Sequence, residues 1–78
     1  MDVEYMKAHL DEEISGAKDY VTKGINSNDL ELIQMGTQEM EHANFWRHKL
    51  NDPAADKKFS DAVTYIRQQL KVYGDNHA

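Results

Sequence analysis

The chain of 78 residues contains no cysteine. It can therefore form no disulfide, no thiolate metal site and no cysteine nucleophile. A domain of this size buries only roughly 60% of the surface that its unfolded chain exposes, so its own core is thin. Without disulfides, a partner subunit or a metal ion is the remaining source of additional stability.

Long hydrophobic runs are also missing, and basic residues are few. The apolar stretches fall far short of the ~20 residues that a transmembrane helix needs, and the segment from Met1 to Glu4 is unlike a secretory signal. The net charge of −5 disfavours a nucleic-acid or anionic-membrane surface and favours cations as ligands. We therefore expect a soluble, cytoplasmic protein that binds neither nucleic acid nor membrane.

A single proline and four glycines interrupt the chain, and turn-forming residues cluster at two places. The spacing of apolar residues predicts helices over about 3–24, 29–50 and 54–73, within one domain that covers residues 1–74. We expect Gly24 to cap the first helix, with the turn centred on Asn26, and residues 75–78 to form a frayed tail. No strand is predicted. The expected fold is all-α, an antiparallel hairpin followed by a third, packing helix.

Two carboxylates fall within the apolar stripes of the first two helices. Glu13 lies in the first stripe and Glu39 in the second, where His42 follows three residues later on the same helix face. A turn centred on Asn26 places the two glutamates at the same height of the hairpin. Carboxylates in apolar surroundings are costly unless they are paired, protonated or bound to a cation. Small residues nearby allow close helix approach and leave space for ions: Gly16, Ala17, Gly36 and Ala43.

These observations predict a metal site with Glu13, Glu39 and His42 as ligands. Oxygen and nitrogen donors without thiolate suit Fe(II) or Mn(II), with Zn(II) as a competitor. One hairpin supplies half of a two-metal carboxylate site, and a two-fold homodimer would complete both the site and a four-helix bundle. In the alternative, the glutamates pair with Lys or Arg on the surface and His42 bonds a backbone carbonyl.

The pattern resembles the ferritin-like di-iron carboxylate proteins over roughly residues 6–50, on Glu13, Ala17, Tyr20, Glu39, His42 and Trp46. It is similar in particular to half-size members such as the encapsulated ferritins, whose two-helix protomers pair around iron. The resemblance implies a dinuclear iron site shared between protomers. In that site Glu13 is the first-helix ligand, Glu39 the bridging carboxylate and His42 the imidazole ligand. It also implies a homodimer or larger even-numbered oligomer, and an encapsulating shell protein as a partner.

The function that this resemblance implies is binding and O₂-dependent oxidation of Fe(II), a ferroxidase activity in which Glu13, Glu39 and His42 are the catalytic residues. One alternative is a non-enzymatic helical dimer, an interaction module with a vestigial metal site. Another is an enzyme on the same scaffold that uses Mn or mixed metals to oxidise an organic substrate.

Four neighbouring residues have roles that the sequence leaves open. Glu12 would replace Glu13 as ligand if the helix were rotated. His9, one turn before Glu13, is expected on the plain surface, with a role as a ligand's partner or an alternative ligand as the other options. Tyr20 and Trp46 are expected in the core, and the alternative is that they are redox-active neighbours of the iron.

Overall fold

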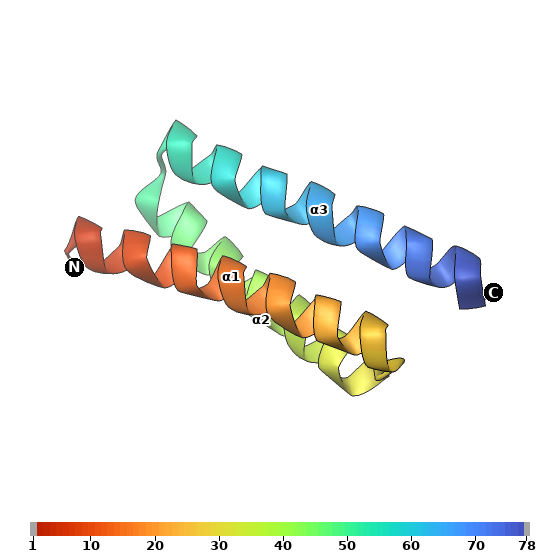
Figure 1. The fold of residues 1–78 in the computed structure, drawn as a ribbon. Helices are drawn as coiled ribbons and strands as arrows, with labels where there is room; N and C mark the ends of the chain where they lie inside the picture. Colours follow the sequence, from red (N-terminus) through yellow and green to blue (C-terminus); the bar gives the residue numbers. More distant parts are fainter. Residues whose placement is uncertain (1, 78) are drawn as a thin grey trace.

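The computed structural model describes residues 2–77, which form three α-helices and no strand. Helix α1 spans Val3–Ser27, α2 spans Leu30–Leu50 and α3 spans Pro53–His77. α1 and α2 form an antiparallel hairpin, and α3 runs along it in the same direction as α1 (Figure 1). The all-α class is therefore confirmed. Within the described residues, no helix combines the length and the apolar character needed to cross a membrane.

Each connection between helices is built from an Asn-Asp pair. Asn28, with φ of 53°, closes α1 in the left-handed conformation, and Asn51, with φ of 47°, closes α2 in the same way. The carboxylate of Asp29 then accepts two backbone N–H hydrogen bonds at the start of α2. Asp52 accepts one from the backbone N–H of Ala54 at the start of α3. Two residues thus suffice to end one helix and begin the next.

The helix ends differ from the predicted ones. α1 continues to Ser27, because Asn28 rather than Gly24 supplies the left-handed cap. α3 begins at Pro53 and continues through Gly74 to His77, because Gly74 keeps a negative φ and does not act as a cap. The predicted end at residue 73 is therefore wrong, as is the frayed tail for residues 75–77. Ala78 lies outside the described residues.

The two hairpin helices approach each other at their glycines. A Cβ atom on Gly36 would lie 2.6 Å from Val21 Cγ2 and 2.9 Å from the carbonyl oxygen of Ala17. A Cβ atom on Gly24 would lie 2.7 Å from Ile33 Cγ1. Separations below 3.0 Å are shorter than side chains tolerate. The predicted close approach is therefore present, and Gly24 serves it instead of capping the helix.

The core draws on all three helices. The predicted stripe of α1 is confirmed at Met6, Leu10, Ala17 and Gly24, which are buried, but Ile14 and Val21 are buried in place of Glu13 and Tyr20. On α2, Gly36 and Ala43 are buried, and Met40 rather than Glu39 belongs to the core. The buried apolar residues of α3 are Ala55, Ala62 and Ile66.

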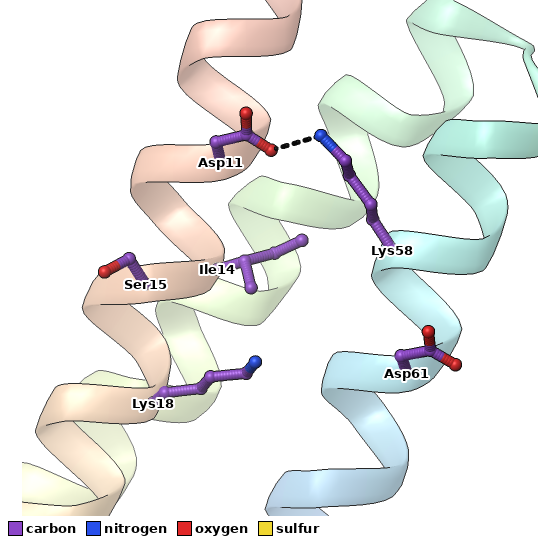
Figure 2. Close-up of a pocket in the computed structure, with 6 residues that line it drawn as sticks. All are labelled: Asp11, Ile14, Ser15, Lys18, Lys58 and Asp61. Carbon is purple, nitrogen blue, oxygen red and sulfur yellow. Dashed lines mark hydrogen bonds and ion pairs between the residues drawn. The ribbon is translucent and has the colours of Figure 1, made fainter.

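Polar contacts hold α3 along its length. Figure 2 shows Asp11, Ile14 and Lys18 of α1 facing α3, where Lys58 pairs with Asp11 at 3.0 Å. Further contacts join Arg47 to Asp56 at 3.2 Å and the Tyr73 hydroxyl to the Asn28 side chain. Glu13 follows Asp11 by two residues, about 200° around the helix. Its side chain therefore leaves α1 on the side away from α3.

We expect Gly36→Ala to destabilise the fold. The added methyl group meets backbone atoms that cannot move aside, so overpacking should lower the free energy of unfolding by about 1–3 kcal/mol. Overpacking outweighs the gain of about 1 kcal/mol in helix propensity. Gly74→Ala is the matched control, because a Cβ atom there meets nothing within 4 Å. Urea unfolding compares the two, and equal stabilisation in both variants would contradict the close approach.

Candidate metal centre

The structure brings Glu13, Glu39 and His42 together. Each offers one ligand atom, and these atoms lie within 4.8 Å of one another. Glu13 comes from α1 and the other two from one face of α2. The turn consists of residues 28 and 29 rather than being centred on Asn26. Moving the centre of a hairpin offsets opposed positions by twice the shift, here about three to five residues or roughly 5–7 Å, so the expectation that the two glutamates lie at the same height is wrong. The length of the glutamate side chains absorbs this difference, so the two carboxylates still meet.

The three side chains form a gradient from the interior to the solvent. The exposed fraction of the side chain is 18% for Glu13, 30% for Glu39 and 63% for His42. Glu12 is exposed and is not part of the group. Of the two adjacent glutamates, Glu13 therefore faces α2. A site with a buried carboxylate at its base and an exposed imidazole at its rim is accessible to an ion from solution.

The carboxylates lack a cationic side chain as a partner. Within the described part of the chain, the ion-pair neighbours within 4.0 Å are histidines: His9 beside Glu13 and His42 beside Glu39. Oε2 of Glu13 is buried and accepts no hydrogen bond. An orphaned, buried carboxylate oxygen costs stability unless a cation binds it. This arrangement disfavours the alternative in which both glutamates pair with Lys or Arg, and it fits a bound metal ion.

The small residues around the site divide into two groups. Ala17, Gly36 and Ala43 are buried between the helices and allow their close approach. Gly16 is different, because a Cβ atom there would meet Oε2 of Glu39 at 3.9 Å and nothing closer. Gly16 therefore leaves room beside a candidate ligand oxygen, as the sequence predicted.

An aromatic cluster lies one turn from Glu13 and consists of Tyr5, His9, Phe45 and Trp46. The His9 ring stacks on Trp46 with centroids 4.9 Å apart and planes 26° apart, and Tyr5 lies 4.4 Å from His9. Phe45 meets Trp46 edge-on at 5.0 Å. The expectation that His9 is a plain surface residue is therefore wrong. Trp46 also packs against the core, as expected.

Besides Trp46, three aromatic residues lie on this side, and only one of them, Tyr20, was singled out from the sequence. Tyr20 is half-buried and lines a hollow beside Gly16. Sequence reasoning missed Tyr5 and Phe45, each of which is 51% exposed. A signal was present, because Tyr5, His9 and Glu13 follow one another at intervals of four and share one face of a helix.

No protein-family model matches the chain, and neither a curated protein nor a solved structure matches it. The resemblance to ferritin-like proteins therefore rests on the hairpin residues alone and stays a prediction.

We expect Glu13→Leu to stabilise the metal-free protein. The change removes a buried acceptor without a partner, which costs about 1 kcal/mol or more. The measurement is urea unfolding in the presence of a chelator. Glu12→Leu is the matched control, and because Glu12 is exposed it should change stability by no more than about 0.5 kcal/mol. A Glu13→Leu variant that is less stable than wild type would show that the carboxylate already has a stabilising partner.

Proposed function

We propose that the chain binds Fe(II) through Glu13, Glu39 and His42 and, as a homodimer, oxidises it with O₂. The observation that carries the proposal is the three-residue cluster with its unpartnered Glu13 oxygen. Two carboxylates and an imidazole are donors that suit Fe(II), whereas the thiolates that select softer metals are missing from the chain. The negative charge of the two carboxylates attracts a divalent cation to this side of the hairpin.

A second copy of the chain would complete the site. One chain offers three ligands, and a two-fold axis would place a second set opposite the first, as in four-helix bundles with two metal ions. The side of the hairpin away from α3 carries large exposed side chains that support such an interface. Tyr5 and Phe45 are 51% exposed, and Met35, which shares the helix face of Glu39 by spacing, is 38% exposed.

In the proposed reaction, iron is the substrate. Each Fe(II) gives up one electron, and O₂ takes two electrons and two protons to become hydrogen peroxide, which leaves Fe(III). The role of the chain is electrostatic, because carboxylates bind the more highly charged product more strongly than Fe(II). Glu13 and Glu39 therefore favour loss of the electron. The exposed His42 supplies the nitrogen ligand at the rim.

Native mass spectrometry tests this proposal. The protein is loaded with Fe(II) without oxygen and then exposed to air, and hydrogen peroxide is measured in parallel. We expect an even-numbered oligomer with about one iron per chain, as a shared two-metal site requires. Glu39→Ala should abolish iron uptake. Glu41→Ala removes an exposed carboxylate of the same helix and is the matched control, with uptake like that of wild type.

Three results would contradict the proposal: a monomer in the presence of iron, undiminished uptake by the Glu39→Ala variant, and a dimer that binds no iron. The last of these would support a non-enzymatic interaction module.

A further inference from the structure

We infer that His9 is a positioning residue for Glu13: its imidazole N–H holds one carboxylate oxygen, and the aromatic cluster holds the imidazole. This inference rests on the proposed function, because it assigns a role to His9 at the same metal site. It adds a residue that the three-ligand group does not contain.

The two oxygens of Glu13 have different surroundings. Oε2 is buried and accepts no hydrogen bond, whereas Oε1 lies 4.0 Å from Nδ1 of His9. One oxygen is therefore without a partner while the other faces an imidazole nitrogen, which is a donor when Nδ1 carries the proton. This division suits a metal ligand, since carboxylates that bind metals are themselves oriented by hydrogen bonds. The separation exceeds a hydrogen bond by about 1 Å, and the terminal torsion of glutamate is soft enough to close it.

The His9 ring is held in place from two sides. Trp46 stacks on it at 4.9 Å and Tyr5 contacts it at 4.4 Å. An exposed histidine samples several rotamers, and fixing one of them costs entropy that the ring contacts offset. A histidine held in this way is already oriented before any ion arrives. Trp46 and Tyr5 thus act on the site through His9.

His9 and His42 resemble each other in one respect and differ in another. Each has Nδ1 at 4.0 Å from a glutamate Oε1 of its own helix. The His42 side chain is 63% exposed and joins the ligand group, whereas His9 is 33% exposed and lies outside it. Moving His9 to an ion would break its stack on Trp46. The geometry therefore separates a ligand, His42, from a support, His9.

Three variants of His9 and His48 test the inference with Co(II) as the probe ion. His9→Phe keeps an aromatic ring to stack on Trp46 and removes the donor. His9→Asn restores an N–H near the position of Nδ1. His48→Phe is the control, because His48 is exposed and its side-chain contact is with Arg47. Calorimetric titration gives the affinity, visible absorption reports the Co(II) ligand field, and thermal unfolding of the metal-free proteins checks the fold.

We expect His9→Phe to bind Co(II) about 10–100-fold more weakly than wild type, with shifted absorption bands and an unchanged metal-free melting temperature. His9→Asn restores the donor without the stacked ring and should recover part of the lost affinity, and His48→Phe should bind like wild type. Wild-type affinity in His9→Phe, with binding abolished in Glu39→Ala, would overturn this inference alone. Failure of His9→Asn to recover, with loss of a nitrogen ligand in the spectrum, would overturn it by making His9 a ligand. A wild-type protein that binds neither Co(II) nor Fe(II) would overturn the proposed function as well.

Discussion

The close approach of α1 and α2 at their glycines determines where the larger side chains can go. Atoms of α1 occupy the place where a Gly36 side chain would lie, and atoms of α2 occupy that of Gly24. At these two positions the facing side chains, Val21 and Ile33, fill the space against the glycines, and other large side chains leave the hairpin on one of two sides. α3 covers the first side with an apolar contact. The second side has no covering helix among residues 2–77, and it carries Glu13, Glu39 and the aromatic cluster.

Glu13 lowers the free energy of unfolding of the metal-free protein, because part of its carboxylate is buried without a partner. A leucine at this position would bury no polar atom, whereas the native residue buries a carboxylate oxygen without a partner. Residues of this kind are typical of functional sites, where stability is lower than the fold permits. A ligand that binds only the folded state raises the free energy of unfolding by mass action and so offsets the stability that the carboxylate costs. Ion binding and folding would thus be coupled in this protein.

The sequence predicted the helices and the meeting of Glu13, Glu39 and His42, because apolar spacing and turn residues are local signals. It did not predict that Ile14 and Met40, rather than the neighbouring Glu13 and Glu39, belong to the core. Which edge of an apolar stripe is buried depends on tertiary contacts, and these leave no mark in the spacing of a single helix. The stacking of His9 on Trp46 was not predicted for the same reason, since Trp46 lies on the other helix.

Each Asn-Asp connection has only two residues between helices, so it cannot absorb a change in helix length. This limits the insertions and deletions that the chain can tolerate in evolution. In each connection one residue closes a helix and the next opens another. A residue inserted into or deleted from α2 between Leu30 and Glu39 would rotate everything beyond it by about 100°. Glu39 would then turn away from Glu13. Substitutions can therefore accumulate on the outer faces, whereas insertions and deletions between the two glutamates should be rare among descendants that keep the site.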